Sequence, residues 1–495
     1  MQETISLFIL VGGAILAALA GTAAMVGTVQ LTSHRAYGYL HLIFYAMVLL
    51  VALGTLLSGR DLSIVNLNME EPRITPRHPL MQWTQPLVSL LMLAAAGERI
   101  LSYWFRRDRT AAAPVVLMMS FIIFWLGTVA APAFLGAHPH VFHGYAYPLI
   151  LGIAAVLVTG TESDIAFKAA RNALLLFMLA GLLLIPVKPA LVLETAYTQG
   201  LLPGLPRLGG LAAHAVSLSV LAQLGLICLL AFPYRRAWLN LLAWGVGLSV
   251  LILAQSKTTW ISFILCGICF VAVQKGSGFS RRLSDPARPG FGIVSIMLCM
   301  VAILAIGLVL MFGDLGTRIN VFFNSAEGVQ LSSLTGRDKI WAIAYEEWRR
   351  NPVFGYGPLI WESDFRISIG MPNATHAHNQ FMDTLSRSGS VGAAALVLYA
   401  VMLLILSVRY VRESKGLTLA LFMLLAIRSI SEVPLLLLGY SPEFITHLLL
   451  LMSIAAMANN ARVRKAASLQ IQKQSTAYPA HPRAKNPLGT ARTSA

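Results

Sequence analysis

Charged residues are scarce in this chain. They make up 12% of its 495 residues, whereas hydrophobic residues make up 57%. Water-soluble domains carry about a quarter charged residues, so this composition excludes an ordinary soluble protein. The sequence predicts instead a protein that is embedded in a membrane.

Cysteine is also rare, and none of the cysteines lies in a polar loop. Cys228, Cys266, Cys269 and Cys299 all fall within apolar runs, which excludes a disulfide framework. The Cys266-x-x-Cys269 pair has no second pair and no histidine beside it, so it does not match a zinc site. We interpret all four as small residues buried between helices.

Long apolar runs are abundant. The first has no lysine or arginine before it and continues past residue 25, so we interpret it as a membrane span and not as a cleavable signal peptide. Runs of about 20 residues cross a bilayer as helices, which satisfy their own backbone hydrogen bonds. The sequence therefore predicts an all-α integral membrane protein, a polytopic bundle of about 12–13 transmembrane helices.

The predicted spans share helix length and lie between polar breaks. The run at 80–97 contains Gln82 and Gln85, and without it 12 spans remain. The spans are 5–29, 36–58, 80–97, 115–136, 145–160, 173–194, 211–232, 238–255, 258–275, 292–312, 389–410, 416–438 and 443–458.

Basic residues gather in alternate loops. They occur near 106–109, 235–236, 275–288 and 411–415, and again in the tail after residue 458, which has no acidic residue. Lysine and arginine accumulate in cytoplasmic loops, so we expect this side and the C-terminus to be cytoplasmic. The net charge of +16 then reflects orientation and attraction to anionic membrane lipids, and it requires no nucleic acid as a partner.

The opposite, external side carries one long polar segment. Loops of such length usually have a function of their own. We therefore divide the chain into N-terminal transmembrane helices at 1–312, a large external loop with short amphipathic helices at 313–388, C-terminal transmembrane helices at 389–458 and a basic, disordered tail at 459–495.

The large loop contains an amphipathic helix that we expect to begin near Asp338. Arg337 stands at the start of this helix, where an anion, most naturally a phosphate, is favoured. Gly355 and Gly357 follow the helix and would let the backbone approach a bulky group closely. A capped surface helix followed by a turn explains the same residues equally well.

The segment THAHNQFMD, at 375–383, places His376 and His378 two residues apart. A metal ion would need further ligands, and the sequence contains no HExxH and no DxD, so we expect no metal site and no cofactor. One histidine held by a neighbouring amide or carboxylate suffices as a general base. Two histidines at the membrane surface without a catalytic role are the alternative.

Other polar groups lie near the same predicted face. We expect Arg207 at a glycine-rich helix start, with His214 two turns into that helix. Arg428 and Glu432 lie four residues apart inside a predicted span, where ionisable groups are costly and usually functional, although a helix ion pair would also explain them. We expect four basic residues to converge on one external cavity that binds a polyanion: Arg207, Lys257, Arg337 and Arg428.

Taken in order from about residue 200 to 395, these motifs resemble the bacterial superfamily of O-antigen ligases and polysaccharide polymerases. The HAHN segment followed by Asp383 is particularly similar to the exopolysaccharide polymerase branch. The matching segments are RLGG at 207–210, SKT at 256–258, LTGRDKIW at 334–341, NPVFGYG at 351–357 and HAHN at 376–379.

The resemblance implies an inverting, metal-independent glycosyltransferase of the bacterial inner membrane whose catalytic loop is periplasmic. Its donor would be a sugar chain on undecaprenyl diphosphate, and its partners would include membrane lipids and other polysaccharide export or chain-length proteins. Arg207 and Arg337 would hold the diphosphate, and one histidine would take the proton of the acceptor hydroxyl. We favour His378, beside Asn379, over His376.

The acceptor is not revealed by any residue. A polymerase that joins lipid-linked repeat units is the favoured interpretation, and a ligase that moves finished glycan to a lipid or protein is the alternative. A transporter or lipid flippase is a third hypothesis, but such proteins typically contain internal repeats, and we detect none between the halves of this sequence.

Overall fold

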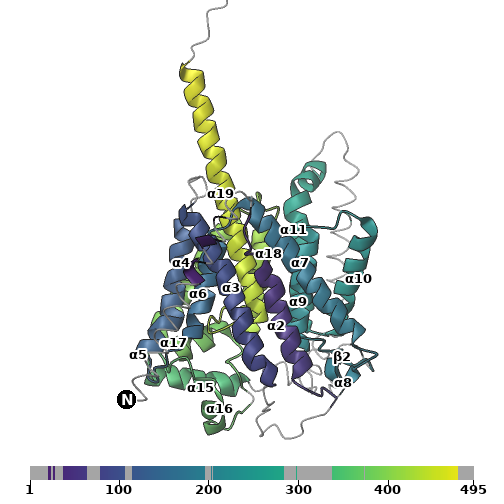
Figure 1. Cartoon of the computed structure of the whole chain (residues 1–495), viewed down its shortest axis with the longest axis vertical. Helices are drawn as coiled ribbons and strands as arrows, with labels where there is room; N and C mark the ends of the chain where they lie inside the picture. The colour runs from purple at the N-terminus through teal and green to yellow at the C-terminus, as the bar shows by residue number, and fades with distance from the viewer. Residues whose placement is uncertain are drawn as a thin grey trace, which may run out of the picture.

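The described part of the chain is mostly helical and contains almost no strand (Figure 1). The computed structural model describes residues 21–23, 26–27, 30, 37–63, 78–105, 114–195, 202, 204–283, 297, 337–372 and 374–477. Its regular structure comprises many helices and one two-stranded antiparallel sheet. This confirms the predicted all-α polytopic membrane fold.

In chain order the structure contains α2 (Leu42–Leu57), α3 (Pro79–Phe105), α4 (Val115–Trp125), the π-helix η1 (Leu126–Ala130), α5 (Ala131–Leu135), the 3-10 helix η2 (His143–Tyr145), α6 (Ala146–Val156), α7 (Gly160–Leu183), α8 (Pro189–Val192), β1 (Leu193–Glu194), β2 (Arg207–Leu208), α9 (Ala215–Ala231), α10 (Ala237–Leu253), α11 (Lys257–Leu283), α15 (Arg337–Arg350), α16 (Ser363–Ser368), α17 (Gln380–Arg409), α18 (Leu417–Ser431) and α19 (Pro442–Ala477).

Six segments of the described chain are helical, long and apolar enough to cross a membrane: Pro79–Phe105, Val115–Leu135, Gly160–Leu183, Lys257–Lys275, Gln380–Arg409 and Pro442–Leu469. Shorter apolar helices stand beside them, among them α2, α9 and α18. The predicted spans at 5–29 and 292–312 lie largely or wholly outside the described residues.

The predicted span that contains Gln82 and Gln85 forms α3, a helix of 27 residues. Trp83 and Trp104 project from its two ends and are strongly exposed. They are separated by about 30 Å along the helix axis, which matches the thickness of a bilayer's hydrocarbon core. Tryptophan is enriched at both membrane interfaces, so α3 has the features of a complete span.

One predicted span was placed several turns too late. We expected a helix at 173–194, whereas α7 covers Gly160–Leu183. Its polar first turn is stabilised by a capping box between Thr159 and Glu162, and Glu162 also pairs with the buried Arg99 of α3 at 3.1 Å. A hydropathy reading discards such a polar turn because it does not register its buried partner.

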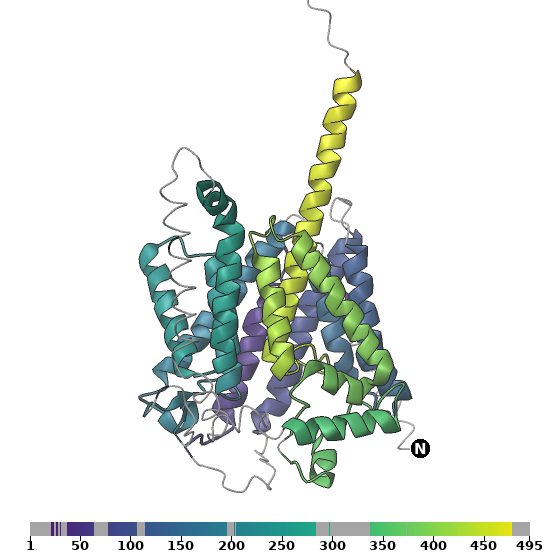
Figure 2. The same ribbon diagram turned by 180° about the vertical axis from the view of Figure 1, so that it is seen from behind.

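The loops and the C-terminus lie at opposite ends of the bundle (Figures 1 and 2). Helices α15 and α16 and the small sheet lie at one end, which we call the loop end, while α19 extends beyond the other, the tail end. At the loop end Ala137 N donates to Gly355 O at 3.0 Å. We expected disorder from residue 459, but α19 continues as a helix to Ala477.

Helix α17 is broken near the loop end. Gly389 has φ of +63° and ψ of −163°, so the helical hydrogen bonds around it are interrupted. The segment that follows α15 supplies the missing partners: Tyr356 N donates to Ser386 O at 2.9 Å, and Ser390 N donates to Pro352 O at 2.8 Å. The NPVFGYG motif therefore docks onto the break and fixes the start of α17.

Candidate active site

The two histidines lie in the short segment that leads into α17, and this segment is anchored on three sides. Asn379 caps α17 by accepting from Met382 N at 3.0 Å and also donates to Ile430 O of α18 at 3.2 Å. Asp383 accepts from Ala377 N at 3.1 Å. Trp341 of α15 donates to Ala377 O at 2.8 Å. We expected Asn379 to bind substrate, but the nitrogen and the oxygen of its side-chain amide both make hydrogen bonds within the protein.

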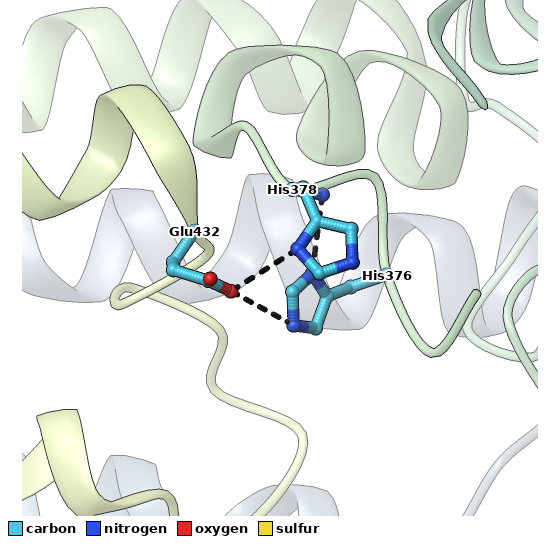
Figure 3. Close-up of side chains that lie close together, drawn as sticks. All are labelled: His376, His378 and Glu432. Atoms are coloured by element: carbon cyan, nitrogen blue, oxygen red, sulfur yellow. Dashed lines mark hydrogen bonds and ion pairs between the residues drawn. The ribbon is translucent and has the colours of Figure 1, made fainter. Parts of the chain in front are cut away.

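A carboxylate from α18 meets both histidines (Figure 3). One oxygen of Glu432, Oε2, lies 3.1 Å from Nε2 of His376 and 3.4 Å from Nδ1 of His378. All three side chains are mostly buried, and the two imidazole rings pack edge to face with their centroids 4.2 Å apart. The result is a compact acid–base cluster at the loop end.

The backbone fixes the proton of His376. The N–H of His378 donates to Nδ1 of His376 at 3.1 Å, so this nitrogen is an acceptor. A neutral imidazole has one N–H, which must then lie on Nε2 and point towards Glu432. Burial, and next the neighbouring His378, lowers the pKa of His376 to about 4. His376 is therefore neutral near pH 7, with both nitrogens engaged.

His378 is held differently. Its φ of +49° is in the left-handed region, which is rare for a residue with a side chain and occurs often at functional sites. Its Nδ1 is buried and faces Glu432, although the angles do not meet those of a hydrogen bond. Among the described residues, no group bonds to its Nε2. That nitrogen is the one available to a substrate.

Glu432 remains ionised at neutral pH. Burial by itself would raise its pKa, but contact with His378 and the charges of Arg428, His376 and His378 together bring it below the ordinary value. Arg428 Nη2 lies 3.8 Å from Glu432 Oε1 and 3.6 Å from Glu443 Oε1. Helix α18 ends at Ser431, so the predicted span at 416–438 was too long, and Glu432 follows the helix at the loop end.

The cluster also has to be considered as a metal site. Residues His376, His378 and Glu432 can offer three ligand atoms within 4.8 Å of one another, and Glu432 is a ligand that our motif search did not find. However, a metal ion on Nε2 of His376 would force the ring's proton onto Nδ1, which faces the N–H of His378. The existing hydrogen bond therefore favours an acid–base cluster over coordination.

Arg207 lies in strand β2, not at a helix start, and the helix that follows begins at Ala215 with His214 as its N-cap. The β1–β2 pairing sets Glu194 opposite Arg207, and their side chains pair at 3.6 Å. Arg207 Nε also donates to Ala254 O at 2.8 Å. The arginine is thus held in place beside the α10–α11 connection.

The remaining basic residues lie close to the same end. Lys257 is exposed at the start of α11, and its neighbour Thr258 lines a pocket that Arg428 also lines. Arg337 is the first residue of α15 and stands one helical turn before Trp341, whose indole contacts the histidine segment. The charges of Arg207 and Arg428 both act on the imidazole of His214, so both arginines lie within electrostatic reach of one histidine.

Gly355 and Gly357 approach the chain's own backbone. Gly355 has φ of +71°, and a Cβ there would lie 2.6 Å from the carbonyl oxygen of Arg387. Gly357 has φ of +121°, and a Cβ would lie 2.4 Å from His138 O. Glycine is therefore needed at both positions because their segment docks closely onto α17 and the α5–η2 loop. This agrees with the interpretation of the segment as a turn.

Residues 241–397 match the family model described as O-antigen ligase. This match supports the O-antigen ligase and polymerase superfamily. No curated protein matches the chain. The matched region begins in α10 and ends within α17, so it contains Lys257, Arg337 and both histidines.

The match and the apolar helices support a multi-pass membrane protein of the ligase and polymerase type. The family consists of membrane glycosyltransferase-like enzymes that act on lipid-linked oligosaccharides in general. Sequence reasoning missed the contact of Glu432 with the histidines, because Glu432 was paired only with Arg428. It also missed Arg60, whose guanidinium donates to Gly210 O at 2.6 Å and to Ala213 O at 2.7 Å. No pattern around Arg60 signals this role.

Proposed function

We propose that the protein polymerises undecaprenyl-diphosphate-linked oligosaccharide repeat units into an exopolysaccharide or O-antigen-type polysaccharide. The observation that carries this proposal is the pairing of His378 with the ionised Glu432, which leaves Nε2 of His378 open at the loop end. A carboxylate that orients a histidine is a recurrent arrangement for a general base.

The proposed reaction is a single inverting displacement. The acceptor hydroxyl attacks the anomeric carbon of the donor sugar while its proton passes to Nε2 of His378. The bond from that carbon to the diphosphate oxygen breaks, and the electron pair leaves with the diphosphate. Glu432 then stabilises the imidazolium of His378, in the way that a buried carboxylate supports a histidine base. No nucleotide or metal ion enters the step.

The basic residues would hold the leaving group. Arg207, Arg337 and Arg428, with Lys257, supply positive charge around the loop end, and charge that develops on the departing diphosphate is stabilised by such preorganised donors. Arginine suits this task because its planar guanidinium binds phosphate oxygens in pairs. Nε of Arg428 is buried without a hydrogen-bond partner among the described residues, so a bound oxyanion would satisfy it.

We also propose that the loop end faces the periplasm of a bacterial inner membrane and that α19 ends in the cytoplasm. The basic tail supports this orientation because Arg462, Arg464 and Lys465 all lie on the part of α19 that leaves the tail end. Membrane lipids, and other polysaccharide export or chain-length proteins, would be its partners in the cell.

A ligase is the second candidate, and the description of the matching family model favours it. A ligase would use the same donor and the same base but would transfer the glycan to a lipid or protein acceptor. The two functions differ in products. Purified protein that is given only a defined undecaprenyl-diphosphate repeat unit yields a ladder of longer lipid-linked chains if it is a polymerase.

The test is therefore turnover of that substrate in nanodiscs, with products separated by mass. We expect a ladder from the native protein and none from His378→Ala or Arg337→Ala, with both variants still present in the membrane. Normal extension by the double variant would refute the catalytic assignment. No extension by native protein, combined with transfer after a lipid acceptor is added, would establish the ligase.

A further inference from the structure

His214 is an imidazole that the proposed displacement does not use. It is the N-cap residue of α9, its backbone is extended, and its side chain makes no capping hydrogen bond. The side chain is exposed, and its Nε2 lies 3.4 Å from Ser217 Oγ. A histidine in this position contributes little to the start of the helix, since Ser, Thr, Asp and Asn are the preferred caps.

The backbone on both sides of His214 is nevertheless tightly held. Arg60 donates to Ala213 O at 2.7 Å and to Gly210 O at 2.6 Å, and the distance to Ala212 O is 2.5 Å. On the other side, Ala215 N donates to Glu194 Oε1 at 3.2 Å. A polar side chain that stands on a firmly held backbone and has no strong hydrogen bond of its own is the arrangement expected of a residue that binds a ligand.

Charges of both signs surround this imidazole. Glu432 and Arg428 act on it from the α18 side, and Glu194 and Arg207 act on it from the two strands. The contacts on the strand side place the start of α9 beside the proposed site: the Glu194 carboxylate accepts from Ala215 N at 3.2 Å and pairs with Arg207 at 3.6 Å.

We propose that His214 is a diphosphate ligand of this site and that it takes up a proton when the diphosphate binds. This inference rests on the proposed function, because it assigns a partner to the same site. A dianion that settles between Arg207 and Arg428 brings a new negative charge beside the ring, which favours the imidazolium. The imidazolium then donates a charge-assisted hydrogen bond to a phosphate oxygen.

Before the diphosphate binds, the surroundings of His214 favour the neutral form of its imidazole. Although the side chain reaches solvent, loss of hydration among the surrounding protein atoms is the largest effect on His214 and lowers its pKa. Glu432 and Glu194 oppose this shift, Arg428 and Arg207 add to it, and the net pKa is below the ordinary value. The ring is therefore neutral near pH 7 before binding. A bound diphosphate moves the pKa in the opposite direction, so protons flow from the solvent to His214 as the site fills. The proton comes from the buffer, and no bond to the substrate changes.

Farnesyl diphosphate is a suitable probe because it carries the same headgroup as the proposed product. Calorimetric binding near pH 7, repeated in buffers that differ in ionisation enthalpy, gives the number of protons taken up. We expect uptake in native protein and a loss of up to one proton in His214→Asn. Asparagine is a preferred N-cap, so this variant keeps the helix start while it cannot be protonated. Affinity should fall about tenfold with the lost charge-assisted bond.

His143→Gln is the control, because His143 is an exposed histidine of the same end that we give no role. It should bind the probe with native proton uptake. His378→Gln should lose turnover but keep the uptake. Equal uptake by native protein and His214→Asn would overturn the inference and leave the base assignment intact. Absence of any binding by native protein would instead count against the proposed function.

Discussion

At the scale of single residues, Glu432 is the side chain whose removal isolates the base. We expect Glu432→Gln to reduce turnover about 100-fold or more, the usual contribution of a general base, because a neutral amide neither orients His378 nor stabilises its imidazolium. Glu432→Asp keeps the charge and should recover part of the rate. Glu346→Gln removes a carboxylate from an exposed pair with Arg349 and Arg350 and should be silent.

The measurement is the initial rate of lipid-linked sugar transfer in nanodiscs as a function of pH. A structural defect would lower the rate equally at all pH values, whereas loss of the carboxylate should also shift the acidic limb of the profile. Native activity in Glu432→Gln would show that the contact with His378 has no catalytic role.

His376 makes the stability of the folded protein depend on pH. Its pKa is about 4 in the folded chain, chiefly because of burial, against an ordinary value of 6.5. The unfolded chain therefore binds a proton below pH 6.5 that the folded chain refuses until about pH 4. The contribution of this residue to stability is complete above pH 6.5 and is lost as the pH falls towards 4.

We accordingly expect the melting temperature of detergent-solubilised protein to decrease between pH 6.5 and pH 4, and His376→Gln to flatten that slope while lowering the melting temperature at pH 7. A slope that is unchanged in His376→Gln would contradict this assignment. His143→Gln, which alters an exposed ring, is the matched variant.

The choice between the two histidines shows where sequence reasoning ends. The residue types and their order predict an acid–base site in the loop, and the family match supports an O-antigen ligase or polymerase type of function in general. The sequence does not reveal that His378 adopts a φ of +49° and turns its N–H onto His376 Nδ1. Nor does it reveal Glu432, which meets the histidines only because α17 and α18 pack together. That His378 is the base remains a prediction.

At the scale of elements, the docking of the NPVFGYG segment onto the break in α17 can be tested with two glycines. Gly355 and Gly370 both have positive φ, +71° and +67°. A Cβ on Gly355 would lie 2.5 Å from Gly389 N, whereas a Cβ on Gly370 would meet nothing within 4 Å. Gly370→Ala should cost about 1 kcal/mol for the left-handed backbone alone.

Gly355→Ala should cost clearly more and should also reduce turnover, because the displaced segment would release the start of α17 and with it the histidines. The two variants are compared by thermal unfolding and by transfer rate. Equal losses of stability would mean that the segment does not need its close approach to α17.

Hydropathy predicts the ends of a helix correctly where polar residues directly flank an apolar helix. The predicted spans at 115–136 and 238–255 agree with the structure, because their polar breaks are also the ends of the helices. The span at 258–275 agrees at its start, but α11 continues to Leu283. Hydropathy fails where a helix begins with polar residues that are satisfied elsewhere, as in α7, or where it continues past the membrane, as in α19. Both errors come from partners and solvent that a local window does not include.

At the scale of the whole molecule, the two ends of the bundle should face different compartments. Ser368 on α16 and Ala466 on α19 are both exposed and lie at opposite ends. In a chain whose four native cysteines are replaced by alanine, a membrane-impermeant thiol reagent should label Ser368→Cys in intact spheroplasts. It should label Ala466→Cys only in inverted vesicles or after lysis, because the basic residues around it hold that end in the cytoplasm.

Reversed labelling would place the acid–base cluster in the cytoplasm, where nucleotide-activated sugars are available and a lipid-linked donor is not required. The orientation therefore bears directly on the chemistry. With the loop end outside, the energy for transfer must arrive with the donor itself, and a glycan on a diphosphate carries that leaving group across the membrane. If both sites are labelled in intact spheroplasts, the membranes are damaged and the labelling does not report the orientation. An intracellular enzyme therefore serves as the marker of membrane integrity in each preparation.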